Sequence, residues 1–94
     1  MPHDIVDASK VGDGIWKYVV HSDGSARFAE FMLSGSCPKH SDIRIPGKVA
    51  TAAGIIGVNG PDLVVASATS ETLGIHGSID ADYAVLRKMI GGAK

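Results

Sequence analysis

A run of small and hydroxyl-bearing residues, 70–78, comes just before a segment that is typical of a helix. Its sequence is Ser-Glu-Thr-Leu-Gly-Ile-His-Gly-Ser. Glycines let a ligand approach the backbone closely, successive N–H groups can form a concave anion site, and Ser70 and Thr72 would add hydroxyl donors. Two aspartates in the first helical turn would repel an anion from the helix start. The pattern therefore places any phosphate site at Ser70 to Gly74. The alternatives are a connecting loop without a ligand, or a small-ligand site over the whole run.

His40, in the stretch Lys39-His40-Ser41-Asp42, is a candidate general acid or base. Imidazole titrates near neutral pH, so it can accept or release a proton under physiological conditions. Asp42 is a candidate partner that would orient the ring, although a residue two positions on can also point elsewhere. The alternative interpretation is a solvent-exposed loop histidine.

Lys17 interrupts a segment, residues 14–21, that is otherwise apolar except for His21. A lysine held on a rigid strand is a candidate ligand for phosphate or carboxylate, and in that interpretation Lys17, His40 and Ser70 converge on one anion-sized site. The alternative is a cross-strand ion pair with Glu30, which is a common arrangement on sheet faces.

The sequence predicts no metal site, no nucleotide site and no cofactor. The four histidines, at positions 3, 21, 40 and 76, are scattered, and Cys37 with His40 forms a half-site without a second pair of ligands. Cys37 as a nucleophile would need a lowered pKa, and only Lys39 and His40 are near it in sequence. Neither a Gly-x-x-x-x-Gly-Lys nor a Gly-x-Gly-x-x-Gly motif occurs.

A first hairpin must position Lys17. Aromatic and β-branched residues indicate a strand over 14–21, Asp23-Gly24 indicates a two-residue turn, and the return strand covers 26–33. A two-residue turn fixes the register of the facing pairs, which are His21 with Ala26, Val19 with Phe28, Lys17 with Glu30 and Trp16 with Phe31.

A second hairpin must position the 70–78 run. Residues 34–48 are typical of a loop, because their two prolines exclude a long regular helix, although a short helical turn after His40 is allowed. Residues 49–58 are ambiguous, being rich in alanine but interrupted by two glycines, and we predict a strand. The turn sequence at 59–62 joins it to a further strand at 63–70.

The last element is an amphipathic helix that begins near residue 79. Its end signals are Ser78 or Asp80 as the cap, Asp80 and Asp82 in the first turn, Arg87 and Lys88 in the last turn, and Gly91 as the terminator. The face expected to be buried contains Ile79, Tyr83, Leu86 and Ile90.

These elements predict an α+β fold. We expect a small mixed or antiparallel sheet of about four strands, in the order ββ, loop, ββ, α, with the C-terminal helix packed on one face. One domain would cover residues 14–92, preceded by a flexible arm over residues 1–13. Exposed strand edges in so small a domain are compatible with a homodimer.

Composition excludes several classes of partner. The 94-residue chain has a net charge of −1 and no basic block, so nucleic acid is not expected. Its longest apolar runs are far shorter than the roughly 18 residues that span a bilayer, so no membrane association is expected. The single cysteine allows no internal disulfide, and the N-terminus lacks the apolar core of an export signal. The expected compartment is therefore the cytoplasm.

Three patches of the chain carry a resemblance to a known family. Residues 13–20 have the sequence Asp-Gly-Ile-Trp-Lys-Tyr-Val-Val, residues 40–43 His-Ser-Asp-Ile, and residues 70–74 Ser-Glu-Thr-Leu-Gly. They resemble the opening strand, the His-Ala-Asp-Ile segment and the last loop before the C-terminal helix in the Janus/Ocnus family, whose enzymatic member is phosphohistidine phosphatase. Residues 53–56, Ala-Gly-Ile-Ile, lie where that family has Gly-Gly-Gly-Arg-Ile. The chain departs from the family in lacking that arginine and in a shorter segment between the second and third patches.

The resemblance implies a hydrolase that removes phosphate from a protein histidine without a cofactor or metal. His40 would be the base that activates water, Lys17 would bind phosphate, and Ser70, the backbone at Thr72 and Gly74 would form the phosphate loop. The partner would be a phosphorylated protein or a small phosphorylated ligand. The alternative function is a non-catalytic domain for homo-oligomerisation or protein interaction.

Overall fold

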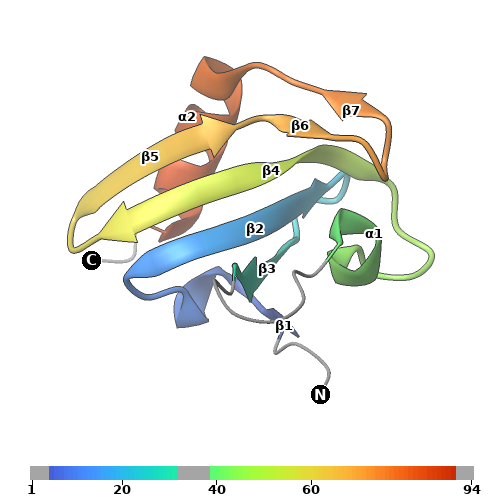
Figure 1. Ribbon diagram of the computed structural model, residues 1–94. Coiled ribbons are helices and arrows are strands. Elements are labelled where there is room, and N and C mark those ends of the chain that lie inside the picture. The colour runs from blue at the N-terminus through green and yellow to red at the C-terminus, as the bar shows by residue number, and fades with distance from the viewer. Residues whose placement is uncertain (1–4, 32–38, 91–94) are drawn as a thin grey trace.

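The computed structural model describes residues 5–31 and 39–90, which form an α+β fold (Figure 1). A five-stranded antiparallel sheet has the order β1-β3-β2-β4-β5. Its strands are β1 (Ile5–Val6), β2 (Gly14–His21), β3 (Ala26–Glu30), β4 (Ala50–Asn59) and β5 (Asp62–Ser67). The remaining elements are a 3₁₀ turn (Ala8–Lys10), α1 (His40–Ile43), α2 (Ile79–Ile90) and a ribbon of β6 (Thr69–Ser70) and β7 (Ile75–His76). The predicted α+β class, with the C-terminal helix packed on one face, is confirmed.

The sheet separates two layers of side chains. The larger core cluster lies between the sheet and α2, and its bulkiest members are Tyr18, Phe28, Ile56, Leu86 and Ile90. The smaller cluster lies between the opposite face and α1, and it contains Val19, Ala29, Ile43 and Ala53. We call these surfaces of the sheet the α2 face and the α1 face. Because successive side chains of a strand alternate, Lys17 lies with Val19 on the α1 face, whereas Tyr18 lies on the α2 face.

The first hairpin has a three-residue turn, so the predicted register is wrong by one residue. The His21 N–H donates to Ser25 O at 2.8 Å, and the Gly24 N–H donates to His21 O at 3.0 Å. Gly24 has a φ of 90°, the left-handed conformation that typically follows a type I turn in a three-residue hairpin loop. The extra residue shifts each facing pair, which become Trp16 with Glu30, Lys17 with Ala29, Tyr18 with Phe28 and Val19 with Arg27.

The ambiguous segment at 49–58 is a strand, as predicted. As β4, it pairs with β2 on one side and β5 on the other. The β4–β5 turn is short because Gly60 has a φ of 61°. The strand expected over 63–70 is divided, since β5 ends at Ser67 and β6 begins at Thr69, next to a register shift in β4 between Ile55 and Ile56.

The inward face of α2 differs from the predicted one. Leu86 and Ile90 are buried as expected, but Ile79 is 49% exposed and Tyr83 is 40% exposed. Asp82 is buried in their place, because its carboxylate accepts the hydroxyl proton of a core tyrosine from β2. The helix starts after Ser78, whose Oγ accepts the Ala81 N–H at 3.3 Å. No helix within the described residues is long and apolar enough to cross a membrane.

Part of the segment expected as a flexible arm belongs to the sheet. Strand β1 pairs with β3 at its outer edge, and Val11 is buried in the larger core cluster. The Trp16 indole N–H donates to Gly12 O at 2.9 Å and attaches this segment to β2. Residues 1–4, Cys37 and the expected helix terminator Gly91 lie outside the described residues.

Candidate functional site

His40 is the first residue of α1, and its imidazole is buried against the sheet. The Nε2 atom lies 2.8 Å from the carbonyl oxygen of Gly54 in β4. A carbonyl oxygen can only accept, so Nε2 carries the proton and the neutral ring has its lone pair on Nδ1. No residue within 5–31 or 39–90 forms a hydrogen bond with Nδ1. The ring is therefore oriented as the Nε2–H tautomer, with a basic Nδ1 that no described residue binds.

Three influences act on the pKa of the His40 imidazole. Burial lowers the pKa most, because the charged form loses hydration, while the Gly54 hydrogen bond raises it in part and the positive charge of Lys17 lowers it further. The result is a pKa below the ordinary value of 6.5. At neutral pH His40 is therefore unprotonated and able to accept a proton.

Lys17 is half-buried on the α1 face in the middle of β2. Its partner in β3 is Ala29, so the predicted cross-strand pair with Glu30 is wrong. The Nζ atom lies 5.5 Å from the centre of the Phe31 ring, in a cation–π contact. Lys17 forms no ion pair with any described residue, so no carboxylate in the described part of the chain neutralises its charge.

The loop 71–74 joins β6 to β7 and is held together by internal hydrogen bonds. Ser70 is buried, and its Oγ accepts the Leu73 N–H at 3.3 Å and lies 3.3 Å from Thr72 Oγ1. Gly74, with a φ of 66°, donates its N–H to close a turn within the loop. The Thr72 N–H, in contrast, has no hydrogen-bond partner in the described part of the chain. Of the groups predicted to bind phosphate in this loop, the two hydroxyls shape the loop and the Thr72 amide stays available.

Two of the predicted residues, His40 and Lys17, lie on the α1 face of the sheet. His40 and Lys17 lie within electrostatic range of each other. Leu73 and Ile75 of the loop and β7 pack against the cluster that contains Ile43 of α1. No hydrogen bond between described residues joins the loop to His40 or Lys17. The candidate site thus centres on His40 of α1 and Lys17 of β2, and no described hydrogen bond brings Ser70 or Thr72 to these two residues.

Asp42 does not orient His40, and this part of the prediction is wrong. Asp42 is exposed and has no hydrogen bond to the imidazole. Residues two positions apart on a helix do not face each other, so the carboxylate points away from the ring. The backbone carbonyl of Gly54 orients the imidazole instead.

Gly54, whose carbonyl orients His40, was not among the predicted site residues. A Cβ atom at this position would lie 1.9 Å from Ser67 O and 2.8 Å from Tyr18 Oη, so no side chain fits. The available signal was a glycine in the interior of an apolar strand, which often marks a close approach of another chain segment.

The other described histidines do not extend the site. His21 is buried and fully bonded, with Nδ1 3.0 Å from Ser25 O and Nε2 accepting the Ile45 N–H at 3.0 Å. His76 is exposed on β7. Within the described residues, no group of three or more His, Cys, Asp or Glu side chains could hold a metal ion.

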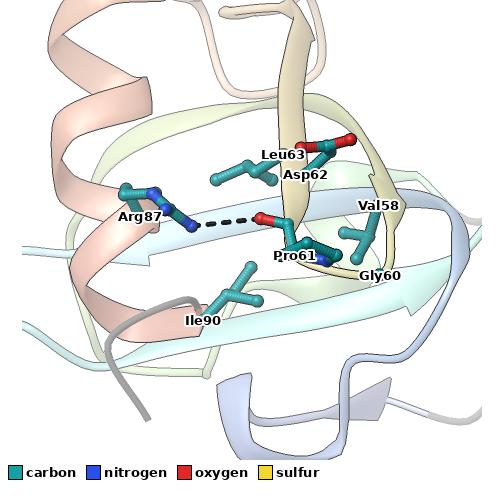
Figure 2. A pocket seen from close by; sticks show the side chains of 7 residues that line it. All are labelled: Val58, Gly60, Pro61, Asp62, Leu63, Arg87 and Ile90. Atoms are coloured by element: carbon teal, nitrogen blue, oxygen red, sulfur yellow. Dashed lines mark hydrogen bonds between the residues drawn. The ribbon is translucent and has the colours of Figure 1, made fainter. Parts of the chain in front are cut away.

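A pocket of about 230 Å³ lies where the β4–β5 turn meets the end of α2 (Figure 2). It is lined by Val58, Gly60, Pro61, Asp62, Leu63, Arg87 and Ile90. Arg87 Nη1 donates to Pro61 O at 3.2 Å (Figure 2). Because Val58, Leu63 and Ile90 belong to the larger core cluster, the pocket borders the α2 face. None of the predicted site residues lines it.

Comparisons with protein-family models, with curated proteins and with solved structures find no match to this chain.

Proposed function

We propose that this protein is a phosphohistidine-phosphatase-like hydrolase, or a phosphate-binding relative of one, in which His40 activates water. The observation that carries the proposal is the 2.8 Å hydrogen bond from His40 Nε2 to Gly54 O. It leaves the basic Nδ1 available, and the lowered pKa keeps the ring neutral at physiological pH. A neutral imidazole with one nitrogen anchored and the other available meets the requirements of a general base.

The proposed reaction is the hydrolysis of a phosphoramidate. A water molecule gives a proton to His40 Nδ1 while its oxygen forms a bond to phosphorus. The phosphorus–nitrogen bond of the phosphohistidine breaks, and the leaving imidazole nitrogen takes up a proton from solvent. Inorganic phosphate and the unmodified histidine depart, and Nδ1 returns its proton to solvent.

Lys17 supports this reaction by its charge. Its ammonium group faces the same side of the sheet as His40 and has no ion-pair partner among the described residues. A cation beside the transferring phosphoryl group stabilises the negative charge on its oxygens. The Thr72 N–H is the candidate for a further donor to the phosphate.

The test is phosphate release from a phosphohistidine peptide in the presence of a metal chelator. We expect turnover by the wild type, a loss of about 100-fold or more in His40→Ala, because a general base contributes that much, and a smaller loss in Lys17→Ala. The matched controls are His76→Ala and Lys10→Ala, which remove an exposed histidine and an exposed lysine. No turnover by a folded wild-type chain would refute the hydrolase proposal, and turnover unaffected by His40→Ala would refute the catalytic residue.

A second candidate, a domain that associates with a second copy of itself, is favoured by one feature of the α1 face. Ile15 in β2 and Val64 in β5 both face Gly57 of β4, and they are 45% and 62% exposed. Gly57 has no side chain, so the two residues form an uncovered apolar patch. Strand β5 is the edge of the described sheet, and its residues 63–66 are uncharged. Antiparallel pairing of two β5 strands would give hydrogen-bond partners to the backbone groups at this edge. It would also bring the apolar patches of the two copies together.

Sedimentation velocity over a range of concentrations tests this second function. A dimer that dissociates in Val64→Lys but not in Val85→Lys would support it, since Val85 is an exposed valine of α2 and not of the edge strand. A wild-type chain that is monomeric at every concentration would exclude it.

A further inference from the structure

A buried hydrogen-bonded pair lies on the α2 face, on the opposite side of the sheet from His40. Tyr18 is fully buried, and its hydroxyl donates to Asp82 Oδ2 of α2. The same hydroxyl lies 3.3 Å from the carbonyl oxygen of Ser67. Burial first, and then the Asp82 carboxylate, raise the pKa of Tyr18 above its ordinary value. The hydroxyl therefore keeps its proton and acts as a constant donor at physiological pH.

The hydroxyl of this pair lies next to Gly54, the residue whose carbonyl orients His40. Tyr18 and Gly54 are facing residues in the pairing of β2 with β4. The space that a Cβ of Gly54 would need is occupied by Tyr18 Oη at 2.8 Å and by Ser67 O at 1.9 Å. The tyrosine hydroxyl thus lies beside Gly54 on the α2 face, in the space that a side chain would take, while the carbonyl of the same residue binds His40 on the α1 face.

We infer that Tyr18 and Asp82 are positioning residues for His40, acting through the backbone of Gly54 across the sheet. The catalytic consequence rests on the proposed function, but the positioning itself does not. Asp82 holds the Tyr18 hydroxyl, the hydroxyl and Ser67 O fix where the Gly54 peptide lies, and the Gly54 carbonyl determines which nitrogen of His40 carries the proton. A buried carboxylate is costly unless it is hydrogen-bonded, so the Asp82–Tyr18 contact persists in the folded chain.

A purely structural role for the pair makes a different prediction. Removing the hydroxyl would then lower the stability of the fold, as the loss of any buried hydrogen bond does, but the folded molecules would keep the wild-type tautomer of His40. The decisive readout is therefore the tautomer, observed in long-range ¹H–¹⁵N correlation spectra of the imidazole. It requires neither substrate nor activity.

The test compares the wild type with Tyr18→Phe, which keeps the buried ring and removes only the hydroxyl. The control is Tyr83→Phe, which removes an exposed hydroxyl on α2. We expect the wild type and the control to hold neutral His40 as the Nε2–H tautomer, and Tyr18→Phe to show a mixture of the two tautomers. Folded Tyr18→Phe with an unchanged tautomer would overturn the inference. If Tyr18→Phe does not fold, Asp82→Asn takes its place. A mixture of His40 tautomers in Asp82→Asn would support the inference, and an unchanged tautomer would overturn it.

Turnover then separates this inference from the proposed function. In an active enzyme, Tyr18→Phe lowers kcat by between about 2-fold and 30-fold with KM unchanged, as expected for a residue coupled to the site without touching substrate. An inactive wild type that still shows the tautomer change in Tyr18→Phe would refute the hydrolase and keep the positioning role.

Discussion

The imidazole Nε2 of His40 lies 2.8 Å from the carbonyl oxygen of Gly54, and this contact decides which nitrogen of the ring is basic. A backbone carbonyl carries no charge and does not titrate. It orients the ring without the large rise in pKa that a carboxylate partner would cause. Burial and the charge of Lys17 therefore lower the pKa of His40 more than the Gly54 hydrogen bond raises it, and the pKa stays below 6.5. The chemistry proposed for the α1 face follows from this pair.

The pH dependence of hydrolysis should follow the protonation of His40. A general base works only when unprotonated, so the rate rises as pH increases through the pKa of His40 and is level at neutral pH. Because that pKa is lowered, the midpoint of the rise lies below 6.5. Lys17→Met removes a positive charge that lowers the pKa, so the midpoint moves to higher pH.

The measurement is the pH profile of kcat/KM, supported by an NMR titration of His40. Lys10→Met is the control, because it removes an exposed lysine from the 3₁₀ turn. A midpoint that stays in place or moves to lower pH in Lys17→Met would show that Lys17 does not act on His40.

Gly54→Ala should destabilise the fold strongly. The added Cβ would meet Ser67 O at 1.9 Å, and this is a backbone atom that cannot swing away. Overpacking of this kind costs about 1–3 kcal/mol or more in the free energy of unfolding, measured by urea denaturation. Gly57→Ala, in the same strand, is the matched control because nothing lies within 4 Å of its added Cβ. Equal stability of the two variants would contradict the close packing at Gly54.

His21→Ala should destabilise the fold without a direct role in chemistry. The ring connects the first hairpin to the segment after α1 through its bonds to Ser25 O and the Ile45 N–H. Loss of two part-buried hydrogen bonds and of the buried ring's packing costs about 2–4 kcal/mol. Thermal or urea unfolding measures this cost, and the exposed His76→Ala should change stability by less than about 0.5 kcal/mol. A His21 variant as stable as the His76 variant would refute the structural role.

The sequence was sufficient to predict an element wherever a single local signal, such as a turn sequence or a helix cap, determined it. The turn sequence at 59–62 and the apolar run after it were sufficient to predict the β4–β5 hairpin, and Ser78 was one of two predicted caps for α2. The register of the first hairpin was wrong because Asp-Gly also fits a three-residue loop. In that loop Asp23 accepts the Ser25 N–H at 2.9 Å and Gly24 takes the left-handed position.

Errors at the helix and the site came from contacts between distant parts of the chain. The buried face of α2 includes Asp82 because Tyr18, 64 residues earlier, supplies its hydrogen-bond donor. The role of Gly54 depends on Ser67, Tyr18 and His40 meeting around one peptide. Helical periodicity and residue spacing contain no information about such partners. Nor could the sequence show that His40 and Lys17 share a face of the sheet, because this depends on where α1 packs on β2.

The role of His40 is tested most directly by the initial rate of phosphate release from a phosphohistidine peptide, measured for the wild type and for His40→Ala at neutral pH. We expect measurable turnover that falls by about 100-fold or more in His40→Ala and is unchanged in His76→Ala. Equal rates in the wild type and a folded His40→Ala would contradict the claim that His40 is the base.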